Sequence, residues 1–297
     1  MKKPELDAGS KQVCALPPKH AAGSAAPASP MPDLQRSRDT RNIAIDKVGV
    51  KDIRYPIVVL DRSKVSQQTV ARINMYVDLP HHFKGTHMSR FIEILNQHHG
   101  EVSVEGVDQI VRAMKEHLEA SCAHLELEFP YFIEKEAPVS RAKSLMEYTC
   151  RFCGSNTNGE FEDFYVGILV PITTVCPCSK EISEFGAHNQ RSIVTVNLRF
   201  KRFIWIEDII QIIEACASCD LYAILKRPDE KFVTERAYEK PMFVEDVVRE
   251  IANRLSKDPN ITWFTVESEN FESIHNHSAY AFVERKPEAR LRKGRGR

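Results

Sequence analysis

Two hydrophobic patterns alternate along the middle of the chain. In one, apolar side chains return at every second position, as at Ile73, Met75 and Val77, which is typical of a half-buried β-strand. In the other, they return every three or four positions, as at Val107 and Ile110, which predicts an amphipathic helix. The chain therefore mixes strands and helices.

These segments follow the same order twice. The first half predicts strands at 53–60 and 67–79, helices over 91–98 and 107–118, and strands at 123–134 and 142–152. The second half predicts strands at 161–175 and 192–203, helices at 206–218 and 243–256, and strands at 261–268 and 278–285. Two ββααββ copies predict an α+β fold of antiparallel sheets with helices on one face. Because such sheets have exposed edges, we expect subunits to associate.

The two ends of the chain have a different composition. Residues 1–38 are rich in Pro, Ala, Ser and Gly, and we expect a disordered N-terminal extension. Residues 287–297 are predicted to be a basic disordered tail, with a nucleic-acid role as the alternative to a solvated end. Between them we place one module at 39–155 and a second at 156–286.

Charge and cysteine content limit the partners and the compartment. Lys plus Arg and Asp plus Glu both number 41, so no overall field attracts nucleic acid or an anionic membrane. No run approaches the roughly 20 apolar residues that span a bilayer. The eight cysteines are too sparse for a disulfide scaffold in 297 residues. We expect a cytoplasmic protein without nucleic-acid or membrane partners.

The most informative segment follows the predicted strand 161–175. It reads Cys-Pro-Cys-Ser-Lys-Glu-Ile-Ser at 176–183 and Gly-Ala-His-Asn-Gln-Arg at 186–191. In extended backbone the thiols of Cys176 and Cys178 face the same way. His188 lies in the same polar loop. Thiolate and imidazole suit a borderline metal such as Zn²⁺ or Fe²⁺.

Two further segments offer carboxylates and imidazoles. Glu272, His275 and His277 lie within six residues just before the last predicted strand, although each histidine taken alone is equally a solvated loop residue. Glu230 is expected in a loop, where it offers a hard ligand. Glu245 starts the final predicted helix. Its carboxylate is either a functional group or a charge that only complements the helix dipole.

Several motifs together carry a resemblance. The segments 176–183 and 186–191, Tyr-Glu-Lys-Pro-Met-Phe-Val-Glu-Asp at 238–246 and Glu-Ser-Ile-His-Asn-His at 272–277 are similar to the type B GTP cyclohydrolase family, as are 39–50 and 85–91. The resemblance covers about 39–284. It implies the tunnelling fold, with two ββααββ modules per subunit and a homotetramer. It also implies conversion of GTP and water to formate and 7,8-dihydroneopterin 3′-triphosphate, the first step of tetrahydrofolate biosynthesis.

By motif, the resemblance implies one divalent metal per active site, Zn²⁺, Mn²⁺ or Fe²⁺, held by Cys176, Glu230 and His275. His188 is implied as a further ligand or a proton-transfer group, and Glu245 as the carboxylate that anchors the base. A bound metal supplies hydroxide at neutral pH for attack on guanine C8.

Other groups are expected to move protons and to bind phosphate. His188, Cys178 or Glu272 is expected to carry protons to N7 and N9 as the ring opens. Five basic groups are candidates for the triphosphate, each with surface solvation as the alternative: Lys84, His87, Arg90, Lys180 and Arg191.

Two other readings stay open. One is another tunnelling-fold enzyme of the nitrile oxidoreductase type, which needs a nucleophilic cysteine and a nicotinamide cofactor. The other is a non-catalytic purine- or pterin-binding protein. The pairs Cys150/Cys153 and Cys216/Cys219 resemble half-sites of a zinc centre, or are ordinary buried cysteines.

Overall fold

The computed structural model describes residues 33–35, 37–98, 103–157 and 160–286. The described residues from 35 onward form one compact unit, which the account below concerns. Most of the predicted N-terminal extension (1–32 and 36) and the predicted basic tail (287–297) lie outside the described residues.

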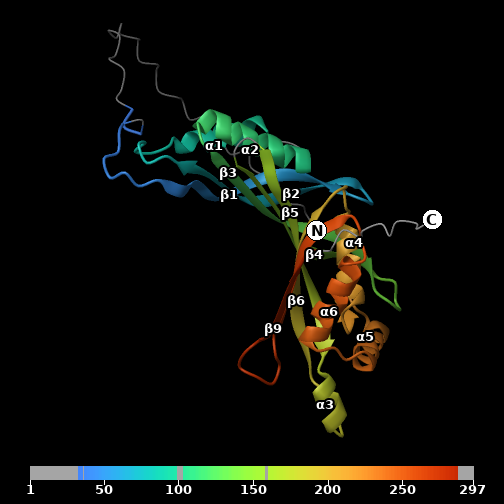
Figure 1. The fold of residues 1–297 in the computed structure, drawn as a ribbon. Coiled ribbons are helices and arrows are strands. Elements are labelled where there is room, and N and C mark those ends of the chain that lie inside the picture. Colours follow the sequence, from blue (N-terminus) through green and yellow to red (C-terminus); the bar gives the residue numbers. More distant parts are fainter. Residues whose placement is uncertain (1–32, 36, 99–102, 158–159, 287–297) are drawn as a thin grey trace, which may run out of the picture. The chain divides into compact units, whose positions relative to one another are not determined.

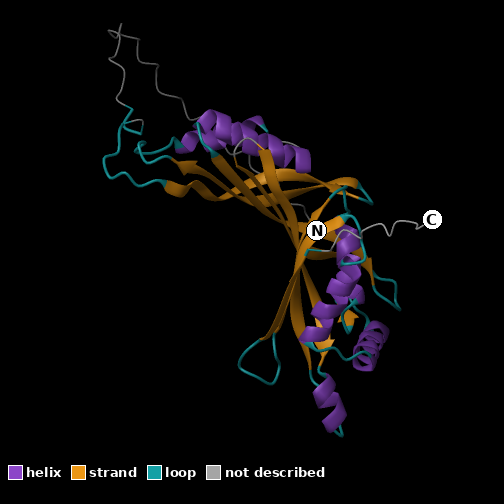
Figure 2. Ribbon diagram, in the orientation of Figure 1, coloured by secondary structure: helices purple, strands orange, loops and turns teal. Residues whose placement is uncertain are grey.

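Long strands are the main elements of the described chain (Figures 1 and 2). They are β1 Ile45–Asp61, β2 Val65–Leu79, β3 Cys122–Glu136, β4 Lys143–Thr157, β5 Glu160–Val175, β6 Asn189–Phe200, β7 Cys219–Asp220, β8 Ile261–Asn270 and β9 Ala279–Arg285. They form one antiparallel sheet in the order β1-β2-β3-β4-β5-β6-β8-β9, and β7 pairs with β5. The two predicted ββααββ copies therefore share a continuous sheet, because β4 pairs with β5 from Thr149–Leu169 to Thr157–Glu160.

Six helices accompany this sheet. They are α1 Met88–Gln97, α2 Val104–Leu118, α3 Pro177–Ile182, α4 Ile206–Ala215, α5 Arg227–Glu239 and α6 Val244–Leu255. Helices α1 and α2 pack on β1–β4, α4 and α5 on β5 and β7, and α6 on β8 and β9 (Figure 1). Each amphipathic helix buries its apolar stripe; in α6 the buried residues include Val247, Ile251 and Leu255.

The core continues from one half of the sheet to the other. Strand alternation places Ile73 and Leu125 inside the first half, and Val194 and Val266 inside the second, all essentially unexposed. All four belong to one cluster of buried apolar residues. The sheet is therefore held as a single packed layer, and its strand ends present the loops that carry polar residues.

The structure departs from the sequence-based prediction at two helices. Helix α5 occupies a segment predicted to be a loop, and α3 occupies one predicted to be extended. Pro228 is the second residue of α5 and Pro177 the first of α3, positions where the missing N–H costs nothing. No helix of the described residues is long and apolar enough to cross a membrane.

Candidate active site

The candidate site lies where β5 ends and β6 begins. The two strands are antiparallel, with Val175 opposite Asn189, and the ladder extends one step further because Cys176 N donates to the His188 carbonyl at 3.1 Å. Opposed residues of an antiparallel pair carry their side chains on the same face, with Cβ atoms about 5 Å apart. The sequence-predicted thiol and imidazole are therefore neighbours.

A short helix shapes the turn between them. Cys176 is the N-cap of α3: its Sγ accepts a hydrogen bond from Ser179 N at 3.5 Å. Ser179 Oγ donates to the Cys176 carbonyl at 3.1 Å and accepts from His188 N at 3.2 Å, so it bridges the two candidate ligands. The expectation that Cys176 and Cys178 face one way in extended backbone is wrong. Cys178 is inside α3 and exposed, because the chain turns helical at Pro177.

The loop between β8 and β9 attaches to this turn at two points. His188 Nδ1 lies 3.2 Å from Ser273 Oγ, and Gln190 Nε2 donates to Glu272 Oε1 at 3.3 Å. Phe271 N donates to the Arg191 carbonyl at 2.9 Å, which continues the β6–β8 register beyond the last paired residues. Segments about 85 residues apart in the chain are thus brought together.

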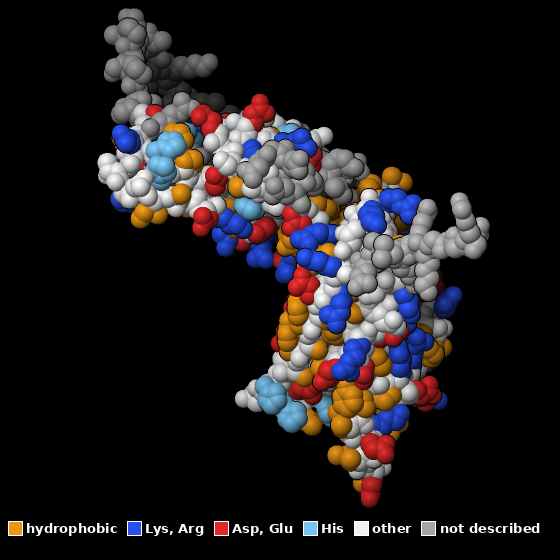
Figure 3. Space-filling view, in the orientation of Figure 1, with side chains coloured by type: hydrophobic (Ala, Val, Ile, Leu, Met, Phe, Trp, Pro, Cys, Tyr) orange, Lys and Arg blue, Asp and Glu red, His pale blue; other side chains and the backbone are white. Residues whose placement is uncertain are grey.

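Two exposed histidines lie in the same loop. The rings of His275 and His277 stack with centroids 5.1 Å apart and an interplanar angle of 18°. In the space-filling view histidine side chains gather on this loop (Figure 3). Both imidazoles are open to solvent and available to bind a ligand.

Glu230 lies in the first turn of α5, not in the loop predicted for it. The neighbouring residue fixes this turn: the buried carboxylate of Asp229 accepts hydrogen bonds from Val139 N, Ser140 N, Ser140 Oγ and Lys226 N at 2.6–2.8 Å. Although burial opposes ionisation, the donors on Ser140 and its neighbours hold the pKa of Asp229 well below its ordinary range. Glu230 itself is exposed.

Glu245 is also exposed, in the first turn of α6. The capping contact of this helix is made by Asp246, whose Oδ2 accepts from Phe243 N at 3.2 Å. The carboxylate of Glu245 makes no hydrogen bond or ion pair with another described residue, which leaves it free to receive a ligand.

The five predicted phosphate-binding groups have different surroundings. Lys180 Nζ donates to the Tyr238 carbonyl at 2.6 Å and lies 4.3 Å from the centroid of its ring, so it ties α3 to the end of α5. Arg90 donates to the carbonyl of His117 at 3.0 Å, near the end of α2. Three stand at loops or strand ends: Lys84, His87, which is the N-cap of α1, and Arg191.

The described residues hold no group of three or more His, Cys, Asp or Glu side chains placed to bind a metal ion. The donor chemistry of Cys176, His188 and His275 fits Zn²⁺ or Fe²⁺, but one chain does not gather these groups with Glu230. Of the other cysteine pairs, Cys150 and Cys153 are three apart on β4 and point to opposite faces. Burial raises the pKa of the Cys216 and Cys219 thiols to about 11, as expected for packing residues.

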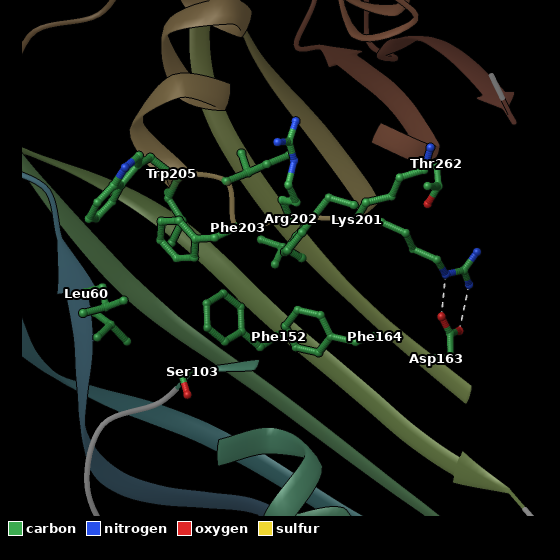
Figure 4. Close-up of a pocket in the computed structure, with 16 residues that line it drawn as sticks. Leu60, Ser103, Phe152, Asp163, Phe164, Lys201, Arg202, Phe203, Trp205 and Thr262 are labelled. Carbon is green, nitrogen blue, oxygen red and sulfur yellow. Dashed lines mark hydrogen bonds and ion pairs between the residues drawn. The ribbon is translucent and has the colours of Figure 1, made fainter. Parts of the chain in front are cut away.

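A separate cavity of about 480 Å³ lies between the ends of β4–β6 and the segment 201–206 (Figure 4). Five of its sixteen lining residues are aromatic: Phe152, Phe164, Phe200, Phe203 and Trp205. The carboxylate among its lining residues, Asp163, is paired with Arg199. None of the candidate catalytic groups lines this cavity.

Three residues of the site were not singled out from the sequence. Ser179 bridges Cys176 and His188 within their turn, whereas Ser273 and Gln190 make the hydrogen bonds that join this region to the β8–β9 loop. The spacing of Ser179, three residues after Cys176, is a capping spacing and was a usable signal. No sequence signal connects Gln190 with Glu272, because their contact depends on strand order.

Comparison with solved structures supports the fold. The chain is similar to a uricase from Bacillus fastidious, with a TM-score of 0.51 and 8% identity over 84% of this chain and 95% of that one. It is also similar to urate oxidase from Bacillus sp. TB-90, with a TM-score of 0.50 and 9% identity over 82% of this chain and all of that one. The predicted α+β tunnelling fold is confirmed.

Comparison of sequences identifies the family. GTP cyclohydrolase FolE2 of Syntrophotalea carbinolica is 65% identical over 257 residues, which cover 86% of this chain and 96% of that protein. GTP cyclohydrolase FolE2 of Geobacter metallireducens is 64% identical over 255 residues, 86% of this chain and 97% of that protein. The model of type I GTP cyclohydrolase folE2 matches residues 31–281. The resemblance seen in the motifs is therefore confirmed, and the chain belongs to the FolE2 family of GTP cyclohydrolases.

Proposed function

We propose that the protein converts GTP and water to formate and 7,8-dihydroneopterin 3′-triphosphate, the first step of tetrahydrofolate biosynthesis, in the cytoplasm. The structural observation that carries the proposal is the joining of the Cys176–His188 turn to the loop of Glu272 and His275 by the bond between His188 and Ser273. This bond joins the segments that carry a thiol, two imidazoles and a carboxylate. Opening of a purine imidazole ring needs such groups as proton donors and acceptors. Because all seven described cysteines are free thiols, a reducing compartment suits the chain.

One divalent metal, Zn²⁺, Mn²⁺ or Fe²⁺, belongs to this proposal. Cys176 and His275 would hold it together with Glu230, and His188 would serve as a further ligand or, when not bound to the metal, as a proton-transfer group. When bound, such an ion supplies Lewis-acid chemistry and makes a water acidic enough to react at neutral pH. The fixed N-cap geometry of Cys176 presents its sulfur from a defined direction, since Ser179 N holds it.

The chain's own residues carry the remaining steps. Addition of water to C8 and opening of the ring require protons to be delivered to the leaving ring nitrogens. Glu272 and His188 follow and precede adjoining strands, which supports their candidacy for this transfer, and the exposed Cys178 is a third candidate. Each would pass a proton between the added water and N7 or N9.

Glu245 selects the base in this proposal. Its exposed carboxylate has two oxygens for the two adjacent donors of guanine, N1–H and the 2-amino group. Adenine offers an acceptor at N1 and would leave the carboxylate unpaired. Lys84, His87, Arg90, Lys180 and Arg191 remain our candidates for the triphosphate, although Lys180 and Arg90 already hold helix ends within the chain.

We further propose that the working form is a homotetramer. Strands β1 and β9 are the edges of the described sheet, and unpaired edges favour association. The α3 tip, which is the end of α3 and the turn after it (182–185), presents Ile182 and Phe185 at 82% and 97% exposure, which is unusual for large apolar side chains. The dispersal of the four metal donors in one chain also favours a site that is completed by assembly.

The experiment is measurement of formate release from GTP, paired with metal analysis, after loading in zinc-poor and in manganese-supplemented conditions. Release of one formate per GTP with about one metal ion per chain supports the proposal. Tight binding of GTP or a pterin without formate would favour the non-catalytic reading. A nicotinamide-dependent reduction of a nitrile would favour the oxidoreductase.

A further inference from the structure

Gln190 occupies a special place on the central strand of the candidate site. In the sheet order β5-β6-β8, strand β6 lies between the strand that leads to Cys176 and the strand that leads to Glu272. Gln190 is opposite Thr174 of β5, and its side chain points to the buried face with 8% exposure. A long polar side chain is thus buried at the end of the sheet where the reacting groups converge.

The hydrogen bonding of Gln190 is one-sided. Its Nε2 donates to Glu272 Oε1 at 3.3 Å, whereas its Oε1 is buried without a partner among the described residues. An unpaired buried carbonyl is costly to the fold, and an apolar side chain of the same shape avoids that cost. The directional contact of this side chain is therefore the hydrogen bond that it donates to Glu272.

We propose that Gln190 is a positioning residue that aims the carboxylate of Glu272 for proton transfer. The inference rests on the proposed function and adds a role that Gln190 plays through Glu272. His188 and Gln190, two residues apart on one strand end, hold the adjacent residues Ser273 and Glu272. The serine contact fixes the loop, and the amide contact then selects the direction of the carboxylate. Proton transfer depends on such alignment within hydrogen-bond reach.

The test is Gln190→Met, which keeps the length and volume of the side chain but removes both the donor and the unpaired carbonyl. We expect a melting temperature equal to or above that of the wild type, unchanged metal content and KM for GTP, and a kcat lowered about 10- to 100-fold. Ser268→Ala is the matched control. Its Oγ is equally buried and unpaired, on the same face of the sheet opposite Val194, but does not touch Glu272. Its kcat should equal that of the wild type.

Gln190→Asn provides a second variant that keeps the amide but is one methylene too short to reach Glu272, and its kcat should fall as well. A double-mutant cycle separates a positioning role from a general structural one. If Gln190 acts through Glu272, adding Gln190→Met to Glu272→Gln should lower kcat no further.

The outcomes distinguish the two proposals. An active wild type together with unchanged kcat in Gln190→Met, or with losses that multiply in the double variant, overturns the positioning role alone. A metal-loaded wild type that releases no formate overturns the proposed function and this inference with it.

Discussion

Replacing Lys135 by Met removes the cation from a largely but not fully buried cluster of charges that joins β3 to α4 and β7. Lys135 Nζ lies 2.8 Å from Glu214 Oε1 and 2.8 Å from Asp220 Oδ2, and it donates to the Leu221 carbonyl at 2.8 Å. The three charged side chains are only 14%, 12% and 20% exposed. Without the ammonium, two nearby carboxylates remain in poorly solvated surroundings, a defect that costs about 3–5 kcal/mol.

The assay is urea unfolding at a fixed protein concentration. With a slope of about 3 kcal/mol per molar urea, the midpoint should fall by about 1 M or more. Lys143→Met is the matched control on the next strand. Its ammonium pairs with Glu134 at 2.9 Å and Glu136 at 3.6 Å, but the side chain is 58% exposed, and its loss should cost about 1 kcal/mol or less.

The two carboxylates of the cluster give this effect a pH dependence. Burial raises the pKa of Glu214 more than the Lys135 charge lowers it. At Asp220 burial also opposes ionisation, but the Lys135 ammonium together with hydrogen bonds, including one from Tyr222, outweighs it and the pKa is lowered. The Asp220 contribution is therefore present above its unfolded pKa of about 3.9 and is lost as the pH falls. The Glu214 contribution is lost as the pH rises through its raised pKa.

In Lys135→Met, acidification protonates Glu214 first, so the deficit in unfolding free energy should shrink between neutral and mildly acidic pH. Glu214→Gln in the same background should recover part of the loss, since one buried charge disappears while Tyr148 keeps a partner at that position. Equal midpoints for Lys135→Met and Lys143→Met would show that the cluster is solvated and that this reasoning is wrong.

The other predictions concern the site and its supports. Cys176→Ala should abolish formate release and weaken metal binding about 10-fold or more, measured by metal analysis, and full metal content with normal turnover would refute the ligand role. Glu245→Gln should lower kcat/KM for GTP on the order of 10⁴-fold with metal content unchanged, and wild-type turnover would place the guanine anchor elsewhere. Asp229→Asn should lower the melting temperature at pH 7, and the difference from the wild type should disappear in acid, because the depressed pKa of Asp229 makes its contribution to stability vanish as the pH falls. A difference that does not depend on pH would show that the charge of Asp229 is not the source of the stabilisation. Phe185→Ser should reduce the oligomer mass in light scattering, and an unchanged mass would remove the α3 tip from the interface.

The strands and the amphipathic helices were predictable because the positions that face the core are apolar, and these positions recur with the period of the element. Strand β2 alternates buried and partly buried positions toward its end, and α6 repeats apolar residues at helical spacing. Helix α5 escaped prediction because it is largely polar along its length, with Asp229 and Ala237 as its buried residues. Its start signals, Pro228 followed by Asp229 and Glu230, were present but read as a loop.

The candidate site was predictable only in part for a related reason. Motifs identified Cys176, His188 and Glu272, but spacing along the chain cannot show that β8 lies beside β6 rather than beside β7. The contacts of Gln190 and Ser273 follow from that strand order. Likewise, Lys180 was selected for its charge, and its use as a partner for the end of α5 depends on tertiary packing.

The strand order also sets the sequence of events during synthesis. From β1 to β6 each strand pairs with its neighbour in the chain, so these hairpins are able to form as the polypeptide leaves the ribosome. Strand β8 reaches β6 only after everything from Phe200 to Ile261 has been made. Until then β6 is a bare edge on a growing sheet, the kind of surface that mispairs with other chains. The candidate site is therefore completed last, and the same late step covers the open edge of β6.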